Sequence, residues 1–320
     1  MIRPQVLVTR RIPRAGMKIL EEGALVDVNE QDALMPHEEL LRRVKGKDGV
    51  LCMLSDRMNG EVMEAGTGLK VISTYAVGYN NIDVREATRR GILVTNTPEV
   101  LREATADLAW SLLMAVARKI PSSDRFVREG RFAGWGPELF LGHEVHGQTL
   151  GIVGMGDIGS AVARRARGFD MKVLYHNRTA NPLAGEIGAE LVPLDELLRR
   201  SDFISLHVPS TPQTKHLIGP RELGLMKSTA IIINASRGEI IDEAALVVAL
   251  REGRIAGAGL DVYEREPLLS PGLADLDNVV LTPHTGSGTF EARDRMAIMA
   301  ARNLLAALRV ERPPNLVEPR

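Results

Sequence analysis

Short apolar segments alternate with helical patterns along almost the whole chain. In the first third, the apolar segments cover residues 6–9, 49–54, 71–74 and 92–95. A second series follows at residues 149–153, 172–175, 203–207, 230–234, 257–261 and 279–281. This rhythm is typical of parallel β-strands connected by helices, and the six strands of the second series suit a dinucleotide-binding sheet.

Three further segments complete the pattern. Residues 98–120 have apolar positions at helical spacing, which predicts a helix that bridges two domains. Residues 122–147 show no clear period and exceed the usual length of a structureless loop, so we expect an arm over 120–147 that mediates dimerisation. A final helix over 290–310 is expected to pack back on the first domain. Asp242 carries the start signal of a structural helix that ends before Gly253.

The length of 320 residues suggests two domains, at about 100 to 200 residues each. We expect a discontinuous substrate-binding domain formed by residues 1–97 and 287–320. Residues 98–286 would form the nucleotide-binding domain. The expected fold class is α/β, with two parallel-sheet domains of Rossmann-like or flavodoxin-like type and a cleft between them.

The composition of the chain excludes some classes of binding partner. Apolar residues make up 44% and charged residues 25% of the chain, as in globular proteins that bury sizeable cores. The net charge of -1 gives no field that would attract nucleic acid or an anionic membrane. Residues 1–8 lack the pattern of a signal peptide and no apolar run is long enough to span a bilayer, so we expect a cytoplasmic protein. Cys52, the only cysteine, is expected to fill the core.

The strongest motif is a glycine pattern between a strand and a helix. Residues 150–159 read LGIVGMGDIG, which places GxGxxG at the end of a predicted strand. Gly154 would permit the tight turn, Gly156 would let the backbone approach a pyrophosphate, and Gly159 would let the helix pack closely on the strand. The amino terminus of the helix would then receive the phosphates. The alternative is a chance glycine turn.

The choice between the two nicotinamide cofactors is expected at the end of the next strand. A carboxylate there would bind the 2′-hydroxyl of NAD, but residues 176–179 read His-Asn-Arg-Thr. Arg178 offers a planar set of donors for a 2′-phosphate, and Asn177 and Thr179 add neutral donors. The sequence therefore favours NADP, with NAD possible if Arg178 is only a solvated loop cation.

Three polar segments follow later strands of the second series. They cover residues 234–238, 261–267 and 283–287 and carry Arg237, Glu266 and His284. Ligands of open α/β sheets bind at the carboxyl ends of strands. Each residue alone is more often a surface or structural group, but after a dinucleotide motif the three are expected to converge.

With these segments in view, the sequence resembles the D-isomer-specific 2-hydroxyacid dehydrogenases, and among them most closely the glyoxylate and hydroxypyruvate reductases. The likeness extends over nearly the whole chain. Besides the motifs already described, it rests on residues 75–83, 95–98, 104–109, 257–262 and 264–267.

The resemblance implies that His284 is the acid-base, Glu266 its partner and Arg237 the anchor of the substrate. The chemistry calls for the same residue types. A ketone that accepts a hydride needs a proton on its oxygen, which histidine can supply near neutral pH. Glu266 would hold the imidazole tautomer and favour its protonated form, and Arg237 would bind the carboxylate of a 2-oxo acid. The implied activity is reduction of glyoxylate or hydroxypyruvate by NADPH, and no metal is expected.

The resemblance also implies further contacts. The expected cofactor-binding residues are Gly154, Met155, Gly156, Asp157, Ile158, Gly159, His176, Asn177, Arg178, Thr179, Val208, Pro209, Thr214, Ala235, Ser236, Asp261, Gly286 and Thr105. Those expected at the substrate are Leu54, Ala76, Val77, Gly78 and Arg237. Trp135, in the arm, resembles an aromatic residue that relatives lend to a neighbouring subunit of a homodimer, although ordinary packing of the arm remains an alternative.

Two other readings compete with the reductase. A non-enzymatic scaffold that senses the cofactor can share this fold, but the complete set of Arg237, Glu266 and His284 argues against it. Another D-2-hydroxyacid dehydrogenase or a phosphite dehydrogenase is the second alternative. Phosphite dehydrogenases carry a lysine where this chain has Val77, which argues against phosphite as the substrate.

Overall fold

The computed structural model describes residues 3–318, which form two compact units. Unit 1 comprises residues up to Leu101 and from Gly288 onward, and unit 2 comprises Arg102–Ser287. The domain boundaries expected from the sequence were 97/98 and 286/287. Residues 1, 2, 319 and 320 of the expected first domain lie outside the described residues.

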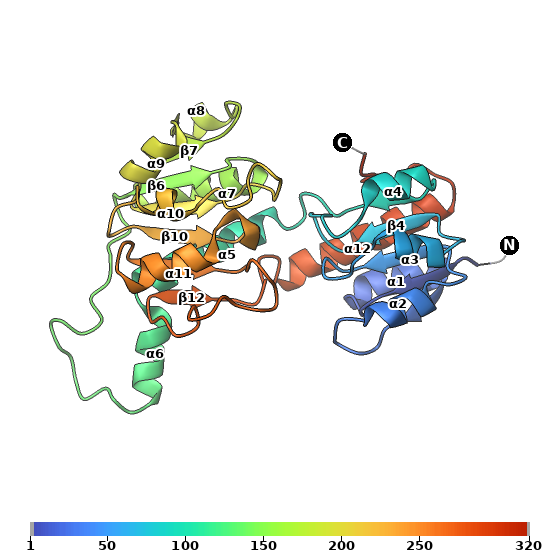
Figure 1. Ribbon diagram of the computed structural model, residues 1–320, viewed down its shortest axis with the longest axis horizontal. Helices are drawn as coiled ribbons and strands as arrows, with labels where there is room; N and C mark the ends of the chain where they lie inside the picture. Colours follow the sequence, from blue (N-terminus) through green and yellow to red (C-terminus); the bar gives the residue numbers. More distant parts are fainter. Residues whose placement is uncertain (1–2, 319–320) are drawn as a thin grey trace. The chain divides into compact units, whose positions relative to one another are not determined.

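Unit 1 is a parallel sheet between two layers of helices (Figure 1). Its strands pair in the order β2-β1-β3-β4-β5, which is the flavodoxin-like order. Helices α1 and α12 pack on one face, and α2, α3 and α4 cover the other. In chain order the elements are β1 (Gln5–Val8), α1 (Arg14–Gly23), β2 (Leu25–Val28), α2 (His37–Arg43), β3 (Gly49–Cys52), α3 (Gly60–Ala65), β4 (Val71–Thr74), α4 (Val84–Arg89), β5 (Leu93–Thr95) and α12 (Phe290–Leu308).

Unit 2 has a seven-stranded parallel sheet in the order β12-β11-β10-β9-β6-β7-β8. The order reverses between β6 and β9, which is the switch point where nucleotides bind in Rossmann folds. In chain order the elements are α5 (Arg102–Ala117), α6 (Ile120–Arg128), β6 (Thr149–Val153), α7 (Asp157–Ala166), η1 (Arg167–Phe169), β7 (Lys172–His176), α8 (Ala184–Ile187), β8 (Ala189–Leu191), α9 (Leu194–Arg200), β9 (Phe203–Leu206), α10 (Pro220–Leu223), β10 (Ile231–Asn234), η2 (Gly238–Ile240), α11 (Glu243–Arg251), β11 (Gly257–Leu260) and β12 (Val279–Leu281).

The core of unit 2 lies on both faces of its sheet. Apolar side chains of α5 and α7 pack on one face, and those of α9, α10 and α11 pack on the other. The inner strand β10 reads Ile-Ile-Ile-Asn and is fully buried, as expected for a strand covered on both sides. The strand ends at Asn234, at the carboxyl edge of the sheet. The polar segment that contains Arg237 follows directly.

The α/β prediction with parallel sheets is confirmed, and the predicted strands appear within one or two residues. The predicted helix over 290–310 is α12, which packs on unit 1 as expected. Asp242 caps α11 through a bond from the Ala245 N–H, and Cys52 is buried in the core.

Three predictions about elements are wrong. The first series contains a fifth strand, β2, and the second contains a seventh, β8, because both are partly exposed edge strands without a clear apolar run. Residues 122–128, for which the sequence showed no clear period, are helical and belong to α6. Helix α6 spans only nine residues and buries none of them, which is too short for the kind of apolar repeat that predicted the helix over 98–120.

Candidate active site

The glycine loop after β6 has the geometry of a dinucleotide-binding turn. Gly154 has a φ of 93°, a left-handed conformation that favours glycine. A Cβ at Gly159 would lie 2.4 Å from the Gly154 carbonyl oxygen, so only glycine lets α7 approach β6 this closely. At Gly156, by contrast, an added Cβ would meet no atom within 4 Å. The backbone of Gly156 therefore faces open space.

The start of α7 fits the pyrophosphate of a nicotinamide cofactor. Gly156 is its N-cap and provides no side chain to satisfy the first N–H groups of the helix. These groups, in the turn of Asp157 and Ile158, can donate to phosphate oxygens beside the open space at Gly156. The Asn177 amide holds the loop, because it accepts from the Met155 N–H at 2.7 Å and donates to the Met155 carbonyl at 3.1 Å.

The end of β7 presents the group expected to select the cofactor. Arg178 and Thr179 are exposed, and Arg178 has no ion pair or hydrogen bond among residues 3–318. The Nδ1 atom of the neighbouring His176 lies 3.1 Å from the Val192 carbonyl oxygen. The Arg178 guanidinium is therefore available to an anionic ligand, whereas the Asn177 side chain is already engaged with Met155.

Two more of the expected cofactor segments follow β9 and β10. Val208 lies against the glycine loop, since a Cβ at Gly154 would come within 2.6 Å of it. The Thr214 hydroxyl donates to the Pro209 carbonyl at 2.6 Å and closes that loop on itself. After β10, the Ser236 N–H and hydroxyl both donate to the Asn234 side chain. Ala235 lies between them and is buried.

His284 and Glu266 form a hydrogen-bonded pair. The His284 Nδ1 lies 2.9 Å from Glu266 Oε2, and Glu266 Oε1 accepts from the Tyr263 N–H at 3.1 Å. Burial acts to raise the pKa of Glu266, but the hydrogen bond and charge of His284, with the Tyr263 N–H and Arg237, keep that pKa below its usual value. Glu266 is therefore an ionised acceptor that fixes the imidazole, leaving Nε2 for other contacts.

Arg237 lies in the electrostatic field of the His284–Glu266 pair and is the third residue expected at the reaction. Burial lowers the pKa of its guanidinium, while the charges of Glu266 and Glu239 oppose that shift. One guanidinium nitrogen donates to the Ser236 carbonyl at 2.6 Å. The side chain is thus a partly buried cation in the field of Glu266. The structure brings the three residues expected at the reaction together at the carboxyl edge of one sheet.

A second carboxylate, Asp261, fixes the segment that carries His284. Asp261 is only 1% exposed and its oxygens accept from the N–H groups of Thr285 and Gly286 at 2.7 and 2.8 Å. The Thr282 hydroxyl donates to it at 2.6 Å. His284 itself has a φ of 54°, a left-handed conformation that is uncommon for a residue with a side chain.

Thr105 lies in the same region. A Cβ added at Gly286 would be 3.3 Å from Asp261 Oδ2 and 3.4 Å from the Thr105 side chain. Helix α5, which carries Thr105, therefore passes directly beside the His284 segment.

Comparison with known proteins shows the family of this chain. Residues 110–286 match the sequence profile of the D-isomer specific 2-hydroxyacid dehydrogenase, NAD binding domain. The glyoxylate reductase of Pyrococcus furiosus is 53% identical over 99% of this chain and 96% of its own length. The chain belongs to the D-isomer-specific 2-hydroxyacid dehydrogenase family.

Solved structures extend the likeness beyond the nucleotide-binding unit of this dehydrogenase. A protein from Thermus thermophilus is 47% identical with a TM-score of 0.93, over 98% of this chain and all of that one. An NADPH-dependent glyoxylate/hydroxypyruvate reductase from Sinorhizobium meliloti, solved with NADP and malonate, is 32% identical with a TM-score of 0.88. That likeness covers 98% of this chain and 97% of the other.

Unit 1 of the dehydrogenase carries the other expected substrate residues at the ends of β3 and β4. Leu54 is partly exposed, Ala76 is buried, and Val77 and Gly78 follow it. Two residues of the 95–98 stretch, to which the sequence analysis assigned no role of their own, hold this segment. Asn96 donates from its amide to the Val77 carbonyl at 2.8 Å, and the Thr97 N–H donates to the Ala76 carbonyl at 2.9 Å. Their position directly after β5 was the sequence feature that could have pointed to this role.

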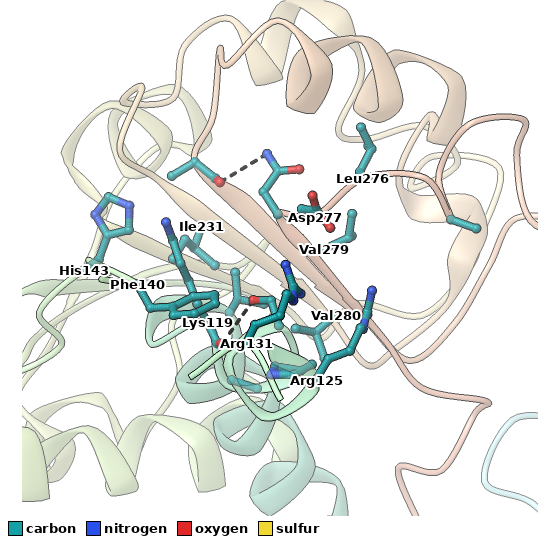
Figure 2. Close-up of a pocket in the computed structure, with 17 residues that line it drawn as sticks. Lys119, Arg125, Arg131, Phe140, His143, Ile231, Leu276, Asp277, Val279 and Val280 are labelled. Carbon is teal, nitrogen blue, oxygen red and sulfur yellow. Dashed lines mark hydrogen bonds between the residues drawn. The ribbon is translucent and has the colours of Figure 1, made fainter. Parts of the chain in front are cut away.

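A pocket of about 390 Å³ lies elsewhere in unit 2 of the dehydrogenase, at the base of the arm. Figure 2 shows the side chains of Lys119, Arg125 and Arg131 in this region, where Val279 and Val280 of β12 also lie. None of the residues expected at the reaction lines it. None of the helices within residues 3–318 combines the length and apolarity needed to cross a membrane.

Proposed function

We propose that this dehydrogenase reduces small 2-oxo acids, glyoxylate to glycolate or hydroxypyruvate to D-glycerate, with NADPH as the preferred cofactor. The observation that carries the proposal is the His284–Glu266 pair beside Arg237, at the sheet edge that also bears the glycine loop. The names of the similar reductases support the substrate class.

The bound cofactor would supply the hydride, and residues of the chain would bind the substrate, orient it and donate the proton. Arg237 would bind the substrate carboxylate and orient the adjacent carbonyl group. Because Nδ1 of His284 faces Glu266, Nε2 is the atom that would give a proton to the carbonyl oxygen. Glu266, ionised by its surroundings, would keep the imidazole in that orientation throughout the reaction.

Further residues of each unit are proposed to bind the ligands. In unit 1, Leu54 and the Ala76–Gly78 segment are proposed to contact the substrate, where backbone N–H groups can bind a carboxylate. In unit 2, Thr105, Asp261 and Gly286 are proposed to border the nicotinamide, and Val208, Pro209 and Thr214 the adjacent part of the cofactor. Asp261 would act there through the segment that it holds.

The preference for NADPH rests on Arg178. Its guanidinium has no partner among the described residues, and no carboxylate stands near it in the sequence to repel a 2′-phosphate. We expect Arg178→Ala to raise the Kd of NADPH about tenfold or more and to change that of NADH much less, because only NADPH carries the phosphate. Equal loss of affinity for both cofactors in fluorescence titrations would refute this role.

We further propose a homodimer formed through the arm over residues 120–147. In the single chain, Trp135 is 84% exposed and Leu141 is 63% exposed. Such apolar side chains gather at protein interfaces when they lie on one surface segment. Phe140 packs edge-on against Phe126, so the arm has an ordered base from which these residues extend.

A kinetic panel tests the function. Glyoxylate, hydroxypyruvate, pyruvate and bulkier 2-oxo acids are each assayed with NADPH and with NADH, and phosphite is assayed with NADP and NAD. The proposal predicts the highest kcat/KM for glyoxylate or hydroxypyruvate with NADPH. Cofactor binding without turnover of any substrate would favour a cofactor-sensing scaffold, and oxidation of phosphite would favour the phosphite dehydrogenase alternative.

A further inference from the structure

The segment that carries Glu266 is packed against the segment that carries Arg237. A Cβ added at Gly238 would lie only 1.9 Å from the Tyr263 carbonyl carbon and 2.4 Å from the Glu264 nitrogen. The backbones therefore touch at the residue directly after Arg237. A movement of residues 262–267 would displace Glu266 and would also press on the backbone next to Arg237. The contacts that hold this segment in place therefore matter for the proposed site.

Two glutamates join this segment to the start of α11. The Glu264 N–H donates to Glu243 Oε2 at 3.2 Å, and the Glu243 N–H lies 3.4 Å from Glu264 Oε2. Each carboxylate thus accepts from the backbone of the other residue. We refer to this reciprocal arrangement of Glu243 and Glu264 as the glutamate clasp.

The burial of Glu243 shows that the clasp is not an ordinary surface contact. Glu243 is only 4% exposed, and its Oε1 atom has no hydrogen-bond partner among the described residues. Burying a carboxylate with an unsatisfied oxygen is costly. The helix does not require it as a cap, because Asp242 already accepts from the Ala245 N–H. The favourable field at the start of α11 offsets part of the cost, but the contact that Glu243 makes through Oε2 is with Glu264.

A histidine outside the proposed site supports the outer side of the clasp. His216 Nε2 lies 2.9 Å from Glu264 Oε1, so both oxygens of Glu264 are engaged. His216 has a φ of 51°, and its N–H donates to the Glu239 carbonyl at 2.8 Å, next to the segment of Arg237. The loop of His216, the helix start at Glu243 and the Glu266 segment therefore meet at Glu264.

We infer that Glu243, Glu264 and His216 are positioning residues that hold the 262–267 segment so that Glu266 meets His284 beside Arg237. They do not touch the reacting atoms. The inference rests on the proposed function for its kinetic consequence, whereas the effect on the segment itself can be measured without any substrate.

The central experiment compares Glu264→Ala and Glu264→Gln with the wild type. The alanine variant should lower kcat for the best 2-oxo acid by about tenfold or more, because small displacements at a reaction centre are costly. The KM for that acid should change less than about threefold, because Arg237, the proposed anchor, is retained. Glutamine keeps an acceptor oxygen for the Glu243 N–H and should restore most of the rate.

A double-mutant cycle separates positioning from general destabilisation. If Glu264 acts through Glu266, then Glu264→Ala should add little to the loss already caused by Glu266→Gln. Losses that multiply would contradict the inference. Glu252→Ala is the matched control, because it removes an exposed glutamate just after α11 that pairs with Arg254 and has no contact with the 262–267 segment.

Hydrogen exchange of the peptide that spans residues 262–267 gives the result that does not depend on turnover. Exchange should be faster in Glu264→Ala than in the wild type and unchanged in Glu252→Ala. Unchanged exchange in Glu264→Ala would overturn the clasp, and faster exchange with an unchanged kcat would overturn its link to Glu266. A wild type that reduces no 2-oxo acid would instead refute the proposed function, while the exchange result would still test the clasp.

Discussion

At the scale of single residues, the site depends on backbone positions that few side chains tolerate. His284 adopts a left-handed φ, and Asp261 accepts from several groups of the same short segment. The types and order of Arg237, Glu266 and His284 could be read from the sequence because they follow strands at the ligand-binding edge. The bonds that Asp261 makes could not, since they join residues more than 20 positions apart.

His207 makes the stability of the chain depend on pH. Burial lowers the pKa of this histidine to about 4, from about 6.5 for an exposed one, and its Nδ1 has no hydrogen-bond partner among the described residues. Its contribution is therefore constant above pH 6.5 and is lost as the pH falls from 6.5 towards 4, because the unfolded chain binds a proton that the native chain does not.

Between pH 7 and pH 5 this difference corresponds to about 2 kcal/mol of unfolding free energy. Urea unfolding at the two pH values should show this loss in the wild type and a smaller one in His207→Gln. An equal loss in both proteins would mean that another group titrates.

At the scale of elements, the turn from β6 to α7 allows folding and binding to be separated. Gly156→Ala places its Cβ in open space, so the variant should keep a melting temperature close to that of the wild type. We expect its affinity for NADPH to fall about tenfold, because a methyl group would occupy the approach of the pyrophosphate.

Gly159→Ala provides the matched contrast, since its Cβ would lie 2.4 Å from the Gly154 carbonyl oxygen. This variant should lose about 1–3 kcal/mol of stability from overpacking. Thermal unfolding and cofactor titration of both variants test whether Gly156 serves binding and Gly159 serves packing. A stable Gly159→Ala, or a Gly156→Ala with normal affinity, would contradict the assigned roles.

The same scale explains which elements the sequence revealed. Buried strands such as β6 and β10 are continuous apolar runs and were predicted at nearly their observed bounds. The edge strands β2 and β8 are partly exposed and gave no such run. Helix α6 spans only nine residues, so the pattern of apolar positions did not separate it from the rest of the arm.

At the scale of the whole molecule, the arm over residues 120–147 exposes large apolar side chains that nothing within residues 3–318 of a single chain covers. We expect the protein to have about twice the mass of one 34.9 kDa chain in light scattering. Leu141→Asp should shift it towards one chain, because a charge at an exposed apolar contact opposes association. Leu183→Asp, an exposed leucine outside the arm, is the control and should remain dimeric. A wild type with the mass of one chain would refute the homodimer.

The most direct test of the account is the turnover of His284→Ala with glyoxylate and hydroxypyruvate in the presence of NADPH. Loss of the proposed proton donor should lower kcat by about a hundredfold or more, while the Kd of NADPH stays near that of the wild type. A variant that binds NADPH normally and turns over at the wild-type rate would contradict the role of His284 in catalysis.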